Sequence, residues 1–139
     1  MKTTKIIYWI ATSLFVLFEG VMPALTFNTQ MAKDGIHHLG YPDYFLILLT
    51  VFKVTGALVL ILPFMKGVIK EWAYAGFTFE LISAAVSNTA VDGLSFLSFF
   101  PLIALVVLAV SYFTYRSLIK LRVSKEVKYK SEYSVSGIA

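Results

Sequence analysis

Residues 44–65, YFLILLTVFKVTGALVLILPFM, are apolar over the length of a membrane-crossing helix and carry a single charge, Lys53. About 20 apolar residues are enough to cross the hydrocarbon core of a bilayer. A charge at the centre of such a helix costs about 2.5–3.5 kcal/mol on insertion, so it normally faces other protein or a polar pathway. The stretch therefore predicts an integral membrane protein with Lys53 inside a helix bundle.

Three further apolar stretches of similar length occupy residues 6–25, 72–91 and 96–115. The chain has 139 residues, of which 58% are hydrophobic and 14% charged, and this composition excludes an ordinary soluble domain. The connections between the stretches are too short to hold a separate soluble module. We therefore predict an all-α membrane protein, a four-transmembrane-helix bundle over residues 1–118, with a basic cytoplasmic tail over 119–139.

The first apolar stretch also resembles a secretory signal, because Lys2 and Lys5 precede it. A signal has a short apolar region that ends at a small-x-small cleavage site. Here the stretch runs past Glu19, and the residues around Pro23 offer no such site. We expect the segment to be retained as the first helix.

Basic residues are distributed unevenly between the two sides that four spans create. Of the 12 Lys and Arg residues, ten fall on the side of both termini, while Lys33 lies on the other side and Lys53 within a span. Because positive residues stay cytoplasmic, we expect both termini in the cytoplasm and the connection with His37 and His38 outside. The expected location is the inner (plasma) membrane, as a multi-pass protein.

Glu19, Lys53 and Glu80 are charged residues inside three different spans. At about 1.5 Å per helical residue, all three come close to the middle of the bilayer, with Lys53 between the two carboxylates in depth. Helices that are adjacent in sequence and joined by short loops tend to be neighbours. The sequence therefore predicts a Glu–Lys–Glu cluster in the membrane core.

The cluster has two readings, a packing device that fixes the bundle or a functional polar site. Interhelical polar contacts in membranes contribute only about 0.6 kcal/mol on average, less than the insertion cost, which favours the functional site. Full ionisation of two acids and one base leaves an uncompensated negative charge, so one carboxyl is expected to hold a proton at neutral pH.

Small and polar residues surround these charges at helical spacing, and we expect them to allow close helix packing. On the third stretch, the face of Glu80 also carries small side chains, so this helix is predicted to be innermost. The fourth stretch has no charged side chain and is expected to face mostly lipid. The predicted binding residues of the polar core are Glu19, Lys53, Glu80, Ser83 and Asn88; the small face of the third helix comprises Ala73, Gly76, Glu80, Ser83, Ala84 and Ser87.

Several kinds of chemistry are not predicted. His37 and His38 lie near acidic residues but lack the i, i+4 spacing of a helical metal site, so we expect a loop or interface role and no metal. There is no cysteine, no phosphate-binding loop and no Ser-His-Asp arrangement, which makes a self-contained enzyme unexpected. Nucleic acid is not a predicted partner, because topology and contact of the tail with anionic lipids explain the net charge of +4.

Three short motifs carry a resemblance to a known family. They are HLGYP at 38–42, KVTGA at 53–57 running to Leu62-Pro63, and EWAYAGF at 71–77 followed by Glu80. In this order and spacing, over about residues 5–118, they resemble the DoxX-like family of small bacterial membrane proteins. The resemblance implies four membrane helices, and relatives that are subunits of thiosulfate:quinone oxidoreductase or partners in membrane oxidoreductase complexes. Relatives often carry His where this chain has Asn88, and the absence of cysteine argues against a sulfur-transfer step here.

Two functional hypotheses follow. The first, which the sequence favours, is a non-catalytic subunit or accessory factor of a membrane complex, with a membrane protein as partner and no cofactor. The alternative is binding or transport of a quinone, a proton or a small solute at the Glu19–Lys53–Glu80 cluster. The lipid bilayer is a partner under both hypotheses.

Overall fold

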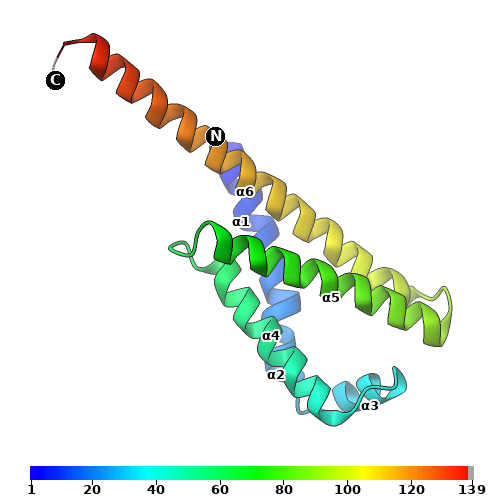
Figure 1. The fold of residues 1–139 in the computed structure, drawn as a ribbon. Coiled ribbons are helices and arrows are strands. Elements are labelled where there is room, and N and C mark those ends of the chain that lie inside the picture. The colour runs from blue at the N-terminus through cyan, green and yellow to red at the C-terminus, as the bar shows by residue number, and fades with distance from the viewer. Residues whose placement is uncertain (138–139) are drawn as a thin grey trace.

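The computed structural model describes residues 1–137, and within this range the chain forms five helical segments and no strand (Figure 1). The all-α prediction is therefore confirmed. The first segment is continuous although its middle is π-helical. The segments are α1–η1–α2 (Lys2–Val16, Leu17–Val21 and Met22–Thr26), α3 (Gln30–His38), α4 (Asp43–Ile61), α5 (Val68–Asp92) and α6 (Phe96–Val135).

Three of these segments are long and apolar enough to cross a membrane: Lys2–Thr26, Asp43–Ile61 and Phe96–Val135. The chain is thus a helical membrane protein with several candidate spans. The segment α5 has 25 residues and a length of about 37 Å, but Glu80, Asn88 and several Ser and Thr residues make it less apolar than the other three. The fourth span is therefore still a prediction.

The helices α5 and α6 form an antiparallel hairpin, and α1 packs along α6 (Figure 1). The helix α4 contacts α5 and η1, while the short α3 lies next to the start of α4. We expected the fourth stretch to face mostly lipid. Most of its side chains lie outside the protein core, but one face of α6 packs against both α1 and α5. Along α6, the side chains of Leu108, Ser111 and Tyr115 are buried, because a small Ser111 lets both α1 and α5 approach the helix closely.

The buried face of α5 also differs from the small-residue face that we expected. Its buried side chains are large: Tyr74, Phe77 and Leu81 point into the bundle, whereas Gly76 and Ser83 are exposed. The ring of Phe77 packs edge-on against Phe15 of α1, with 4.9 Å between the ring centroids. Aromatic rings fill the space between these helices, so Glu80 and its small neighbours lie toward the side of α4.

The helix α6 is 40 residues long and continues 20 residues beyond the predicted end of the fourth span. Residues 116–135 contain no Gly or Pro and many good helix formers such as Arg, Lys, Leu and Glu, which explains why the helix does not stop. At about 1.5 Å per residue it is about 60 Å long, twice the thickness of a hydrocarbon core. Residues 119–135 of the predicted tail thus continue α6 as a helical extension that runs away from the bundle (Figure 1), while 138–139 lie outside the described residues.

Candidate functional site

Glu19 lies in the π-helical turn η1, where the backbone N–H of Met22 donates to the carbonyl of Leu17. Pro23 explains this turn. A proline has no N–H, and its ring clashes with the carbonyl four residues earlier, which here is that of Glu19. Widening the helix by one residue per turn relieves the clash, and such π-bulges occur frequently at functional sites. The bulge places the buried Glu19 side chain toward α4.

Lys53 of α4 joins the two carboxylates. Its ammonium donates to Glu19 Oε2 at 2.5 Å and lies 3.1 Å from Glu80 Oε1. The three side chains are largely buried, with exposed fractions of 8% for Glu19, 15% for Lys53 and 18% for Glu80. The structure therefore brings together the three charges that the sequence places at similar depth. We call them the Glu–Lys–Glu cluster.

Two glycines allow the helices to meet closely beside the cluster. A Cβ atom on Gly20 would lie 2.5 Å from the Cβ of Ala57, and a Cβ on Gly56 would lie 2.8 Å from the ring of Phe77. These distances are below van der Waals contact, so no other residue fits without displacing α4 from its neighbours. Gly20 follows Glu19 directly in the sequence, and Gly56 lies about one helical turn after Lys53, so the close helix contacts flank the cluster.

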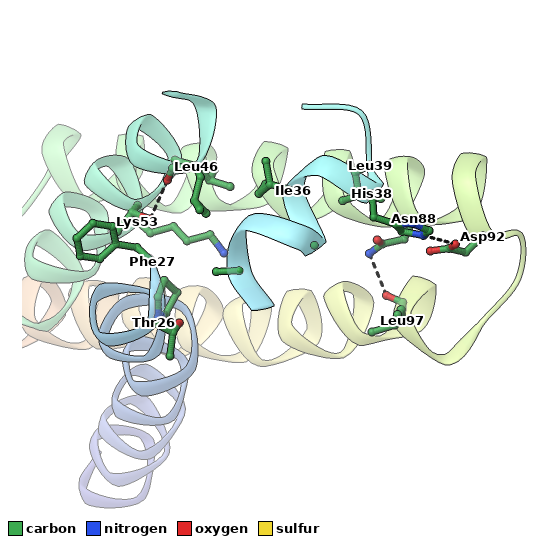
Figure 2. A pocket seen from close by; sticks show the side chains of 15 residues that line it. Thr26, Phe27, Ile36, His38, Leu39, Leu46, Lys53, Asn88, Asp92 and Leu97 are labelled. Atoms are coloured by element: carbon green, nitrogen blue, oxygen red, sulfur yellow. Dashed lines mark hydrogen bonds and ion pairs between the residues drawn. The ribbon is translucent and has the colours of Figure 1, made fainter. Parts of the chain in front are cut away.

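Each member of the cluster lines a different cavity. Lys53 lines a cavity of about 350 Å³ beneath α3, whose far end is formed by Asn88 and Asp92 (Figure 2). Glu80 lines a second cavity of about 250 Å³, and Glu19 lines a third of about 210 Å³ between α1 and α6. The three charged side chains thus border cavities on different sides of the cluster, although little of their surface is exposed.

The second cavity combines a buried acceptor with aromatic walls. Within the described residues, Glu80 Oε2 is buried and has no hydrogen-bond partner. The predicted residue Ser83 lines the same cavity, as do Tyr41 and Phe45, whose rings are stacked with 4.5 Å between their centroids. The Tyr41 hydroxyl is 3.0 Å from that of Ser87. A flat molecule with a hydroxyl group fits this combination, because it can donate to Glu80 and stack on the rings.

Asn88 is not in contact with the charges. Its amide donates to the carbonyl of Leu97 at 3.1 Å. Pro101 explains why that carbonyl is free, since a proline cannot donate the usual helical hydrogen bond to the residue four positions earlier. Asn88 thus links α5 to the first turn of α6 and forms part of the wall of the 350 Å³ cavity (Figure 2). A binding role for Ser83 and Asn88 is still a prediction.

Both histidines pair with aspartates and hold α3 in place. His37 Nε2 lies 2.5 Å from Asp43 at the start of α4, and His38 Nε2 lies 2.6 Å from Asp92 at the end of α5. In the part of the chain that the structure describes, no group of three metal-ligating side chains comes together. The helix α3 therefore covers the 350 Å³ cavity and is fixed at two points.

Sequence reasoning missed a second polar group in the core. The hydroxyl of Ser111 lies 2.7 Å from that of Thr12 and 2.8 Å from that of Tyr74, and it joins α6, α1 and α5. Nearer the N-terminus of the bundle, the buried Lys70 donates to the Tyr8 hydroxyl at 2.8 Å. The sequence signal for this group is Ser111 itself, a polar and uncharged residue within the apolar stretch 96–115. Lys70 precedes the predicted third span, and nothing in the apolar pattern marks it as buried.

Comparison with known proteins agrees with the resemblance of the motifs. A model of the DoxX-like family matches residues 7–128, which is well over half of the chain. No curated protein and no solved structure matches it. The family model covers every residue of the Glu–Lys–Glu cluster and all the helices that position it. On this evidence, the chain belongs to the DoxX-like family.

Proposed function

We propose that the Glu–Lys–Glu cluster binds the polar aromatic head of a lipid-soluble ligand of the quinol class, within the membrane. The observation that carries the proposal is the buried Glu80 Oε2, which has no hydrogen-bond donor among the described residues although it lines a cavity. A buried acceptor without a partner costs about 1–3 kcal/mol, and more when it is charged. A hydroxyl group of a bound ligand supplies the missing donor.

The charges favour a ligand that carries exchangeable protons. Two carboxylates and one ammonium leave one negative charge uncompensated, and a second cation is not within 4.0 Å of Glu80 in the described chain. A proton on one carboxyl, or a hydrogen bond from a hydroxyl donor, would therefore stabilise the cluster by offsetting this negative charge. A quinol hydroxyl provides either, since it donates a hydrogen bond and exchanges a proton.

The walls of the 250 Å³ cavity favour the aromatic part of the ligand. They consist mostly of apolar and aromatic side chains, with polar groups only at Glu80, Tyr41, Ser83 and Ser87. Ligand sites are usually apolar clefts in which a few polar groups fix the orientation. The ring of the ligand lies against Tyr41 and Phe45, and an apolar tail leaves toward the lipid.

We further propose that the protein crosses the cytoplasmic membrane four times with both termini inside. The ten-to-one distribution of basic residues supports this orientation. It places α3 and its two His–Asp pairs on the outer side, and the extension of α6 in the cytoplasm.

The proposal is tested by purifying the chain in mild detergent and quantifying extracted quinones by mass spectrometry. Wild-type protein is expected to carry a quinol near stoichiometry, recovered as quinol together with the quinone that forms when it oxidises in air, and Glu80→Gln is expected to lose it. Glu71→Gln is the matched control, because Glu71 is on the same helix but pairs with Arg116 on the surface. Retention of quinone by Glu80→Gln, or its absence from the wild type, would overturn the proposal.

A second candidate is the accessory-subunit role, and the extension of α6 favours it. Residues 127–135 continue beyond the part of α6 that faces α1, and they expose apolar side chains among basic ones, including Val127, Tyr129 and Tyr133. A chain ending at Glu126 should keep its melting temperature and lose a co-purifying partner. A partner that stays bound to the shortened chain would contradict a docking role for the extension.

A further inference from the structure

A fourth cavity, of about 520 Å³, lies at the N-terminal end of the bundle, far from the Glu–Lys–Glu cluster. It is enclosed by the first turns of α1, the connection from α4 to α5, and the middle of α6. Four basic side chains line it, and Glu126 is the one acidic residue in its wall. The basic residues are Lys5, Lys66, Lys70 and Arg122.

Lys70 sets this cavity apart from an ordinary basic surface. Only 2% of the residue is exposed, and no carboxylate of residues 1–137 lies within salt-bridge distance of its ammonium. The ammonium donates to the Tyr8 hydroxyl and lies 5.5 Å and 5.3 Å from the ring centroids of Tyr8 and Tyr115. Aromatic faces stabilise a cation only partly, so a buried charge without a counter-ion costs free energy.

The surroundings of Lys70 have the properties of an anion site. Burial, and after it the nearby charge of Lys66, lower the pKa of Lys70, which precedes the apolar stretch 72–91. An anion in the cavity would favour the charged ammonium. The Tyr115 hydroxyl accepts a hydrogen bond from the N–H of Gly67 at 3.2 Å, which fixes the loop that carries Lys66.

The apolar part of the wall indicates what carries the anion. Trp9, Pro63, Leu118 and Ile119 line the cavity beside the basic groups, and Trp9 belongs to an interfacial aromatic pair with Tyr8. Tryptophan and tyrosine are enriched at the level of lipid headgroups. A free phosphate ion has no apolar part that could contact these apolar side chains. A phospholipid does, because its phosphate is joined to acyl chains.

We infer that this cavity is a specific site for the phosphate headgroup of an anionic phospholipid, held by Lys66, Lys70 and Arg122. The site is distinct from diffuse attraction of lipid to the extension of α6, because the binding groups come from two separate stretches of the chain, around the start of α5 and within α6, and one of them is buried. It would anchor the bundle at a fixed depth in the cytoplasmic leaflet, independently of any quinol at the Glu–Lys–Glu cluster.

The test is native mass spectrometry of the full chain in detergent with added dioleoyl phosphatidylglycerol. We expect one saturable lipid per chain and weaker binding of dioleoyl phosphatidylcholine. The double variant Lys66→Gln/Arg122→Gln keeps the buried Lys70 and should bind about 30-fold more weakly, at about 1 kcal/mol for each charge. Lys125→Gln/Lys128→Gln is the matched control, because it removes two charges of the extension that do not line the cavity, and it should bind like wild type.

Three results would overturn the inference. Equal binding of the two lipids would remove the need for an anion. An equal loss in both double variants would show diffuse attraction to the extension instead of a site. Competition by inorganic phosphate at millimolar concentration would show that the cavity takes a free anion and not a lipid. Loss of quinone binding in Glu80→Gln has no bearing on any of these outcomes.

Discussion

The ammonium of Lys53 lies 2.5 Å from Glu19 Oε2, and this contact joins α4 to the π-helical turn of the first helix. The same ammonium lies 3.1 Å from Glu80 of α5, so one basic residue holds carboxylates from two other helices. Removing Lys53 leaves two buried carboxylates without a counter-ion. Removing one carboxylate leaves one ammonium paired with one carboxylate. The energetic cost of each change should therefore depend on the others.

Lys53→Met is expected to destabilise the bundle by about 3–5 kcal/mol, because it leaves uncompensated buried charge. Adding Glu80→Gln to Lys53→Met should recover part of this loss, with a coupling of about 0.5–3 kcal/mol between the two sites. Thermal unfolding in detergent of the wild type, both single variants and the double variant measures the coupling. Strictly additive effects would mean that the two side chains do not interact.

Gly20→Ala should destabilise the bundle by about 1–3 kcal/mol, because the new methyl group meets Ala57 and forces α1 and α4 apart. Gly76→Ala is the control: a Cβ there meets nothing within 4 Å, and Ala is a better helix former by about 1 kcal/mol. Restoring space with Gly20→Ala/Ala57→Gly should recover stability in the same melting assay. A Gly20→Ala protein as stable as wild type would exclude the close approach.

Ser111→Ala should cost about 1–2 kcal/mol, since the hydroxyls of Thr12 and Tyr74 both lose their partner. Ser117 lies on the same helix with an exposed side chain, so Ser117→Ala changes composition equally without touching the network. Unfolding curves of the two variants, compared with wild type, give the difference. Equal stability of the two variants would contradict a three-helix network at Ser111.

The orientation is tested by thiol labelling, for which the absence of cysteine provides a clean background. Asp34→Cys and Lys66→Cys both place a thiol at an exposed position, near opposite ends of α4. In intact cells, a membrane-impermeant thiol reagent should label Asp34→Cys. It should label Lys66→Cys only after the membrane has been permeabilised. The reverse pattern would require both termini to be outside.

The sequence predicts the structure best where charged residues lie inside apolar stretches. A charge inside an apolar stretch must find partners, so the meeting of Glu19, Lys53 and Glu80 could be predicted from their similar depth on helices that are adjacent in sequence. Sequence reasoning did not predict the buried face of α6, because a hydroxyl such as that of Ser111 is too weakly polar to reveal that face in the sequence. The π-helical turn at Glu19 was not predicted either, although Pro23 is its visible cause.

The extension of α6 and the cavity at Lys70 were missed for another reason. Basic residues near a predicted helix end were counted for topology, and this count does not distinguish a continuing helix from a loose tail. It also does not distinguish the buried Lys70 from the exposed Lys66 four positions earlier. Only the packing of three segments around these side chains separates them.

The proposal that the Glu–Lys–Glu cluster binds a quinol is tested most directly by an equilibrium binding isotherm of decylubiquinol to the chain in lipid nanodiscs. Wild type and Glu71→Gln should show the same saturable binding to one site. Glu80→Gln should bind about 10- to 100-fold more weakly, the value expected when a hydrogen bond to a charged group is lost. An unchanged dissociation constant in Glu80→Gln, or the absence of saturable binding in the wild type, would contradict the proposal.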